Sequence, residues 1–242
     1  DGLERVMHGV RKPLLKSIHI VPGGIVLPSS SASTCEEVSM ELEQMFLTEM
    51  EKPDVGFFGE NPGWGLEKLP SVIEGCTSLT HLRIPSCGIA SAAGLCKALC
   101  TCSGLEVLDL RNNILRGDTM KCFFDALRGC NALAVLDVSL NHLQDQGVTD
   151  LMAAVAHCTA LRVLKLGSTG ICLAETVAAV GQACAHFTAL GHLDLSDSSL
   201  GLSVVLLAST PDTRFASLHS LGLRTSGMHA YGTTSLSRIL PR

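Results

Sequence analysis

Two aspartates are the residues of this sequence whose type and spacing come closest to a catalytic arrangement. Asp109 lies in the run of residues 105–115, and Asp137 occupies the same place in the run of residues 133–143. Paired carboxylates can share general acid–base work. A catalytic pair also needs a nucleophile or an enclosed pocket beside it, and an open strand surface supplies neither. We therefore predict no catalytic residues and a non-enzymatic protein.

The histidines do not suggest a metal site. His81 and His192 lie too far apart along the chain to share one ion. Five others are dispersed over expected turns and helix ends, where we expect solvated or capping roles: His142, His157, His186, His219 and His229. The chain has no P-loop, no G-x-S-x-G elbow and no H-E-x-x-H zinc motif. We predict no cofactor and no small-molecule substrate.

The eleven cysteines invite a disulfide or metal interpretation. The densest group, Cys96, Cys100 and Cys102, lacks the C-x-x-C spacing of zinc sites and has no histidine nearby. Free buried cysteine behaves as a small apolar residue, and several of the cysteines fall at repeat positions described below. We predict reduced structural thiols, no metal, and an intracellular, cytoplasmic location.

The segments that carry Asp109 and Asp137 share a sequence pattern that recurs along the chain. Residues 105–115 and 133–143 both read L-x-x-L-x-L-x-x-N-x-L, which is the leucine-rich repeat signature. The signature predicts a short strand with inward leucines and a ninth-position Asn that bonds turn backbone. The leucine pattern occurs six times at a nearly constant interval. Its first positions are Leu79, Leu105, Leu133, Leu161, Leu190 and Leu218.

A second set of residues supports this register independently. An apolar residue stands three positions before each first leucine. These residues are Cys76, Cys102, Cys130, Cys158, Phe187 and Phe215. We predict that they occupy one core position at the loop that enters each strand.

The long repeat period, the helical second half of each repeat and the Cys-x-x-Leu entry resemble the ribonuclease-inhibitor-like class of leucine-rich repeats, over about residues 53–228. This class also occurs in the receptor arms of innate-immune nucleotide-binding proteins and in Ran GTPase activators. The resemblance implies an α/β leucine-rich repeat solenoid with a parallel sheet on its concave face and helices on its convex face. Spacing also favours an arc, because strands stack about 4.8 Å apart whereas packed helices need about 8 to 10 Å.

We divide the chain into an irregular N-terminal part, residues 1–52, and an array, residues 53–242, with six clear repeats of about 26–29 residues each. Residues 53–63 fit a weak repeat, and Trp64 opens a helix beside it. Convex helices are expected at residues 91–100, 118–128, 147–157, 173–185 and 202–208.

The N-terminal part contains two predicted elements. Residues 15–25 fit a degenerate first strand in which Gly23 replaces the asparagine. Residues 34–50 fit a helix that a capping box opens, either on the convex side or as a cap outside the array. The sequence begins without Met and without a signal peptide, which suggests a fragment or a processed product.

The third, fifth and seventh positions of each repeat should point out of the concave sheet. The third column is His81, Val107, Val135, Val163, His192 and Ser220. The fifth column is Arg83, Asp109, Asp137, Lys165, Asp194 and Gly222. The seventh column is Pro85, Arg111, Ser139, Gly167, Ser196 and Arg224. We predict that the partner-binding face consists of His81, Arg83, Val107, Asp109, Arg111, Val135, Asp137, Val163, Lys165, His192, Asp194 and Arg224.

Three valines are central to this face. Val107, Val135 and Val163 are expected to be exposed on adjacent strands and flanked by charged residues. An apolar stripe with a charged rim suits a partner's side chain. Valine is also a common strand residue, so both interpretations stay open at this point.

Composition narrows the partner class. The net charge is -5 and the 18 basic residues are scattered, whereas phosphate binding needs a clustered basic face. No apolar run reaches the roughly 18 residues of a membrane span. We therefore predict a protein partner, with no nucleic-acid ligand and no membrane.

The predicted function is a non-enzymatic protein–protein interaction scaffold, a recognition arm or subunit of a multi-subunit assembly. One alternative is a GTPase activator that resembles the Ran activators, with Arg83 and Arg111 as the candidate edge arginines; the acidic tail of that family is missing here. Another alternative is a purely architectural subunit of a ribosome- or cilium-type particle.

Overall fold

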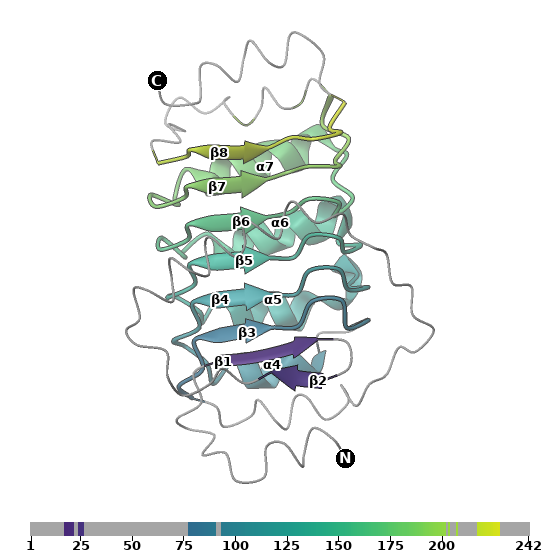
Figure 1. Ribbon diagram of the computed structural model, residues 1–242. Coiled ribbons are helices and arrows are strands. Elements are labelled where there is room, and N and C mark those ends of the chain that lie inside the picture. The colour runs from purple at the N-terminus through teal and green to yellow at the C-terminus, as the bar shows by residue number, and fades with distance from the viewer. Residues whose placement is uncertain are drawn as a thin grey trace.

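The computed structural model describes residues 17–21, 24–26, 77–90, 93–201, 203, 207 and 217–227. It contains one eight-stranded sheet in the order β2-β1-β3-β4-β5-β6-β7-β8 (Figure 1). The strands are β1 (Ser17–Val21), β2 (Gly24–Val26), β3 (His81–Arg83), β4 (Val107–Asp109), β5 (Val135–Asp137), β6 (Val163–Lys165), β7 (His192–Asp194) and β8 (Ser220–Gly222). The helices are α4 (Ala93–Leu99), the 3-10 turn η4 (Gly117–Thr119), α5 (Lys121–Leu127), α6 (Gln144–Val155) and α7 (Ala174–Cys184).

The register of the sheet follows the leucine spacing. From β3 to β8 all neighbouring strands are parallel, and the fourth-position residues Leu82, Leu108 and Leu136 lie opposite one another. The same alignment continues through Leu164, Leu193 and Leu221. Register is strongly specified here because a slip of one residue would turn these leucines out of the core.

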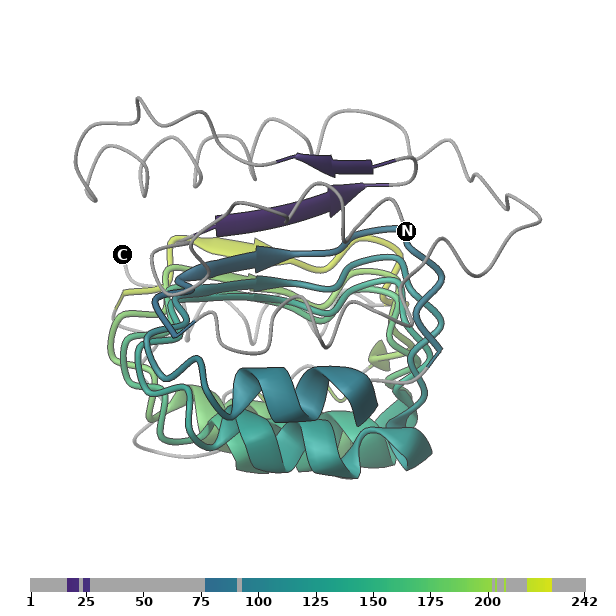
Figure 2. The same cartoon turned by 90° about the horizontal axis from the view of Figure 1, so that it is seen from below.

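The layers are those of the predicted arc. The helices lie together on one face of the sheet, and the strands form the other layer (Figure 2). Between the layers lies one continuous core, in which the first-position residues Leu79, Leu105, Leu133 and Leu161 are all fully buried. The predicted α/β solenoid is therefore confirmed. No helix among the described residues is long and apolar enough to cross a membrane.

The N-terminal end of the sheet differs from the repeats. β1 pairs in parallel with β3, and Ile18 lies opposite Leu82, which confirms the degenerate first strand. The chain then reverses, and β2 pairs antiparallel with β1. Gly23, which the sequence places at the asparagine position, lies outside the described residues. The reversal after β1 differs from the repeat turn, because the chain pairs back on the same strand. The weak repeat at residues 53–63 lies outside the described residues, and β1 and β3 are direct neighbours in the sheet.

Several other predictions fall on residues that the structure does not describe. They are the helix at 34–50, the helix at Trp64, the entry residues Cys76 and Phe215, and most of the helix at 202–208. The remaining convex helices are confirmed to within a few residues, except that α6 begins earlier than expected, at Gln144. The four described entry residues, Cys102, Cys130, Cys158 and Phe187, are buried as predicted.

The second and third convex segments approach closely at a pair of glycines. A Cβ atom on Gly117 would lie 2.7 Å from the Cα of Gly147, and one on Gly147 would lie 2.6 Å from the Cα of Gly117. No side chain fits at these distances. Glycine is therefore required at both positions by the packing of η4 against α6.

The turn after each strand has one conformation in every repeat. The eighth-position residue has a positive φ of 53° to 56° in all six, although none is glycine: Ser86, Asn112, Leu140, Ser168, Asp197 and Thr225. The left-handed turn aims successive backbone N–H groups at the next repeat, as when Ser86 N donates to Arg111 O at 2.9 Å. A left-handed non-glycine residue costs about 1 kcal/mol or more, and these ladder bonds offset that cost.

The ninth-position asparagines lie inside this turn, as the sequence predicts. The side-chain oxygen of Asn113 accepts hydrogen bonds from the backbone of Cys87 and Ile89, at 3.1 and 3.0 Å. Its amide nitrogen donates to Ile84 O and to Leu110 O, both at 2.8 Å. Each such side chain therefore satisfies backbone groups of its own repeat and of the preceding one.

We predict that Asn113→Ala lowers the free energy of unfolding by roughly 1 to 3 kcal/mol, because buried backbone groups lose their partners. Chemical denaturation measures this difference. Asn131→Ala is the matched control, since Asn131 is exposed in a turn and its truncation should change the midpoint little. Equal midpoints for the two variants would contradict the role assigned to Asn113.

A second prediction compares backbone amides that bond across from β7 to β8 with the amide of Leu223, which follows β8. Leu195 N and Asp197 N donate to Gly222 O and Arg224 O, at 2.9 and 2.7 Å, whereas β8 pairs only with β7 among the described strands. We expect native-state hydrogen exchange to show the amides of Leu195 and Asp197 protected and that of Leu223 exchanging much faster. Similar protection at Leu223 would show that another strand or segment covers this edge.

Candidate functional site

The predicted binding face lies on the strand layer, opposite the helices. In the third column His81 lies opposite Val107, which lies opposite Val135. The column continues through Val163, His192 and Ser220. The fifth column is aligned in the same way, so Asp109 and Asp137 are neighbours and Lys165 follows them. The structure thus brings the residues of each column together.

The expected exposure of this face is wrong for most of its members. Seven are buried, with exposures of 0 to 7%: Arg83, Val107, Asp109, Asp137, Val163, Lys165 and His192. Four are half-buried and one is exposed, namely His81, Arg111, Val135, Asp194 and Arg224. Figure 2 shows the end of the sheet, β1 and β2, displaced away from the helices. Because strands lie only about 4.8 Å apart on an inward-curving surface, their side chains converge and cover one another.

The aspartates of the fifth column act on their own turns. The Oδ1 atoms of Asp109, Asp137 and Asp194 each accept a hydrogen bond from the backbone N–H two residues later, all at 3.0 Å. Asp137 Oδ1 also accepts one from the hydroxyl of Ser139 at 2.5 Å. These bonds hold the chain as it leaves the strand. Sequence reasoning missed this role, although the recurring Asp-x-Ser and Asp-x-Arg spacing signals an Asx turn.

The second oxygen of Asp137 faces the next strand. Lys165 Nζ lies 3.7 Å from Asp137 Oδ2, and both side chains are almost completely buried. A buried charge pair recovers its desolvation cost only with good geometry. The 3.7 Å contact links β5 to β6 at the centre of the face, but no hydrogen bond reaches Asp137 Oδ2 among the described residues.

Asp109 stands beside this pair without a cation opposite it on β5. Burial, and then the neighbouring carboxylate of Asp137, raise the pKa of Asp109 to about 6. The guanidinium groups of Arg111 and Arg83 act in the opposite direction but more weakly. An acidic pair on adjacent strands is therefore present, as predicted, but both carboxylates serve turn backbone.

The two histidines of the third column are held in the neutral form. Burial, followed by the charge of Arg83, lowers the pKa of His81 to about 4. Burial and the charge of Lys165 lower the pKa of His192 as well. The ring nitrogens of His192 are buried and have no hydrogen-bond partner among the described residues. At neutral pH these rings therefore carry no charge, although each keeps one donor and one acceptor nitrogen.

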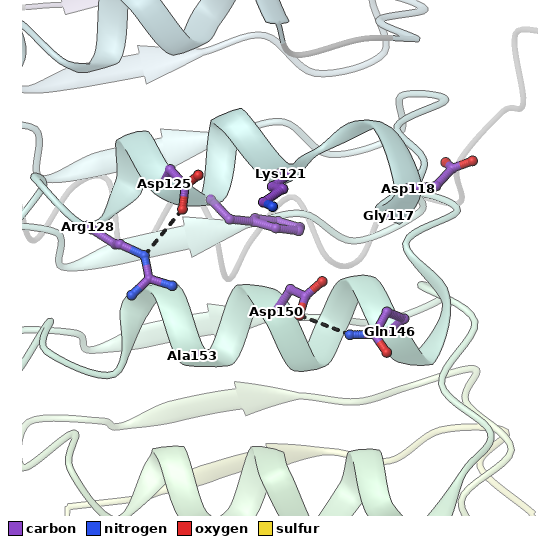
Figure 3. A pocket seen from close by; sticks show the side chains of 9 residues that line it. Gly117, Asp118, Lys121, Asp125, Arg128, Gln146, Asp150 and Ala153 are labelled. Carbon is purple, nitrogen blue, oxygen red and sulfur yellow. Dashed lines mark hydrogen bonds and ion pairs between the residues drawn. The ribbon is translucent and has the colours of Figure 1, made fainter.

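The convex face offers a second candidate, a groove of about 380 Å³ between α5 and α6 (Figure 3). Phe124 and Ala153 contribute its apolar lining. Its charged groups are largely engaged: Arg128 Nε lies 3.5 Å from Asp125 Oδ1, and Gln146 donates to Asp150 at 2.9 Å. These exposed pairs are screened by water and contribute little.

Arg83 and Arg111, the candidate edge arginines of a GTPase activator, differ in exposure. Arg83 is 7% exposed, and Arg111 is half-buried. Among the described residues, no group of three or more His, Cys, Asp or Glu side chains could hold a metal ion.

Six regularly spaced parallel strands, with convex helices and a shared turn, define this chain as a leucine-rich repeat solenoid. A comparison with protein-family models finds no match, and a comparison with curated proteins finds none either.

Similar solved structures include an internalin from Listeria monocytogenes, with 15% identity and a TM-score of 0.40 over 70% of this chain and 55% of that one. A leucine-rich repeat protein from Leptospira interrogans has 14% identity and a TM-score of 0.33, over 71% of this chain and 61% of that one. The plant peptide hormone receptor RGFR1, in complex with RGF2, has 18% identity and a TM-score of 0.35 over 63% and 29%. This chain thus spans less than two thirds of the length of each.

The pKa of Asp109 makes stability depend on pH. Between its usual value and about 6, the folded protein keeps a proton that the unfolded chain has lost, so stability falls as pH rises through this range. Asp109→Asn keeps the Oδ1 acceptor and removes the charge. At pH 8 we expect the variant to be more stable than the wild type by roughly 1 to 3 kcal/mol, with the difference vanishing near pH 4.

Urea denaturation at several pH values measures this dependence. Asp150→Asn is the control, because Asp150 is exposed on α6 and the same substitution there should change the free energy of unfolding little. If Asp109→Asn is destabilising at pH 8, the charge is stabilising in the fold and the assignment is wrong.

Proposed function

We propose that this protein is a non-enzymatic protein–protein interaction scaffold whose partner binds the concave face. The observation that carries the proposal is the alignment of three side-chain columns across β3 to β8. They form one ordered surface, and all the described helices lie on the other side of the sheet (Figure 2).

The buried members of this face support pre-organisation. The Asp137–Lys165 pair and the aspartate-bonded turns hold their side chains in one geometry before any partner arrives. A surface that is already ordered loses less entropy on binding, which favours affinity. Arg83, Val107, Asp109, Asp137, Val163, Lys165 and His192 are thus proposed to shape the site from within.

The accessible members of the face are proposed to make the contacts. Val135 is half-buried at the centre of the third column. Arg111, in the turn after β4, and Asp194, on β7, carry opposite charges on the two sides of β5. His81 lies at the N-terminal end of the columns and Arg224 at the C-terminal end. An apolar centre with a polar rim is the composition of a protein-binding surface. The partner is therefore expected to place an apolar side chain over Val135.

We also propose a repeat class, a location and a kind of partner. We place the repeats in the ribonuclease-inhibitor-like class, because a convex helix follows each of the strands β3 to β6. Among the nine described cysteines no two are joined in a disulfide. The proposed intracellular location rests on the sequence-based prediction of reduced thiols. The proposed partner is a protein of a multi-subunit assembly.

The test begins with cross-linking mass spectrometry on the native protein, which identifies the partner and the residues nearest to it. Binding of the purified partner is then measured for Val135→Glu. We expect its affinity to fall at least about tenfold, a loss of about 1.4 kcal/mol, because a carboxylate at an apolar centre is desolvated without a counter-charge.

Leu173→Glu is the matched control. Leu173 is 53% exposed and immediately precedes α7, on the convex side. This variant should bind as the wild type does, and the circular dichroism spectra of both variants should be unchanged. Equal loss in both variants, or loss in Leu173→Glu alone, would place the partner elsewhere.

A further inference from the structure

Asp194 is a half-buried carboxylate on β7, near the last described strand of the sheet (Figure 1). Cations lie on the repeats to either side, but each faces another carboxylate. Lys165 Nζ lies 3.7 Å from Asp137 Oδ2, and Arg224 Nη2 lies 3.5 Å from Asp197 Oδ2. Within the described part of the chain Asp194 forms no ion pair. Its charge is therefore available to a cation that a partner brings.

Two glycines fix the place of the Asp194 carboxylate on the sheet. Gly222 lies opposite Asp194 on β8, and a Cβ atom there would contact Asp194 Oδ1 and lie 2.9 Å from Asp194 Cγ. A Cβ atom on Gly167 would lie 3.1 Å from Asp194 Oδ2. The carboxylate thus occupies space that a side chain on either neighbour would need. Oδ1 accepts from Ser196 N at 3.0 Å, whereas no hydrogen bond reaches Oδ2 among the described residues.

His192 is a second polar group of this region with unused bonding capacity. It lies two residues before Asp194 on the same face of β7, about 7 Å away along the strand. Its side chain is 6% exposed, and neither ring nitrogen has a hydrogen-bond partner among the described residues. Buried side-chain nitrogens are nearly always bonded. The unbonded ring beside an unpaired carboxylate therefore points to a group that joins them from outside.

We propose that Asp194 and His192 form the subsite of the concave face that receives a guanidinium group, the side chain of an arginine on the protein partner. The proposal rests on the proposed function, because it names the chemistry of one contact on that same face. Val135 shares the third column with His192 and lies two strands away, about 10 Å by strand spacing. The partner therefore presents an apolar and a basic side chain about this distance apart.

The acceptors at this place select the kind of cation. Burial, and then the charge of Lys165, lower the pKa of His192, so the ring is neutral at neutral pH and does not repel a cation. A neutral ring has one acceptor nitrogen, and Asp194 Oδ2 is a charged acceptor. A guanidinium carries five N–H donors in one plane and can serve both acceptors, whereas an ammonium is a point charge. An anionic group would face Asp194 with like charge.

The experiment titrates the isotope-labelled full chain with N-acetyl-arginine amide and follows backbone amides and histidine ring nitrogens by NMR. N-acetyl-citrulline amide is the matched probe, because it has nearly the same shape and no charge. We expect saturable shifts at Asp194, Gly222 and the His192 ring with the arginine probe. The citrulline probe should bind at least about tenfold more weakly, because it makes no charge-assisted hydrogen bond.

Asp194→Asn should weaken binding of the arginine probe at least about tenfold, since it removes the charge and keeps the Oδ1 acceptor for Ser196 N. Asp150→Asn on α6 makes the same change of charge on the convex side and should bind the probe as the wild type does. Equal affinity for the two probes, or full affinity in Asp194→Asn, would overturn the proposal. The two wild-type titrations decide by themselves if the variant folds poorly.

Binding of the purified partner separates this proposal from the proposed function. If Val135→Glu leaves partner binding unchanged, the concave face is not the interface and the proposed function fails. If Val135→Glu weakens partner binding whereas Asp194→Asn does not, the face binds the partner without a guanidinium contact, and only the present inference fails. Loss of affinity in both variants supports both.

Discussion

The structure depends on one constraint, which is the satisfaction of backbone groups at the turn that leaves each strand. In this turn the chain adopts a left-handed residue, and buried N–H and C=O groups must find partners there. Asn141 meets this need in the third clear repeat. Its side chain accepts from Leu115 N at 3.1 Å and donates to Leu110 O at 3.0 Å, so it joins its own repeat to the preceding one. Such bonds add side-chain links between the repeats to the backbone ladder of the strands.

The residue that bonds the turn backbone differs along the array. Thr169 and Ser226 take the asparagine place in later repeats, and their hydroxyls donate only to carbonyls of their own repeats, Leu166 O and Leu223 O. A hydroxyl is shorter than an amide and cannot reach the neighbouring repeat. The backbone ladder still joins these repeats at the turn, as when Gln144 N donates to Thr169 O at 2.9 Å. Other side chains add bonds between the later repeats, such as Ser168 Oγ to Asp197 Oδ2 at 3.3 Å.

Rigidity at the turns explains the character of the concave face. Because Asp109, Asp137 and Asp194 bond the turn backbone, their carboxylates are not free to adapt to a ligand. The same bonds place the charges of the fifth column at fixed points beside the valines. A surface of this kind suits recognition of a complementary shape, whereas catalysis would need a mobile or reactive group in an enclosed pocket.

The sequence by itself determined the repeat, its register and its inward side. Leucines that recur at a nearly constant interval can be buried in only one way by parallel strands, so Leu82, Leu108 and Leu136 had to align. The buried asparagines were predictable for the same reason. Tertiary structure alone decided the burial of the concave columns, because whether Lys165 reaches Asp137 depends on curvature and on the length of side chains across strands. It also decided that β1 turns back into a hairpin. The contact between α4 and α5 likewise arises only when repeats stack, since a full repeat of chain separates the two helices.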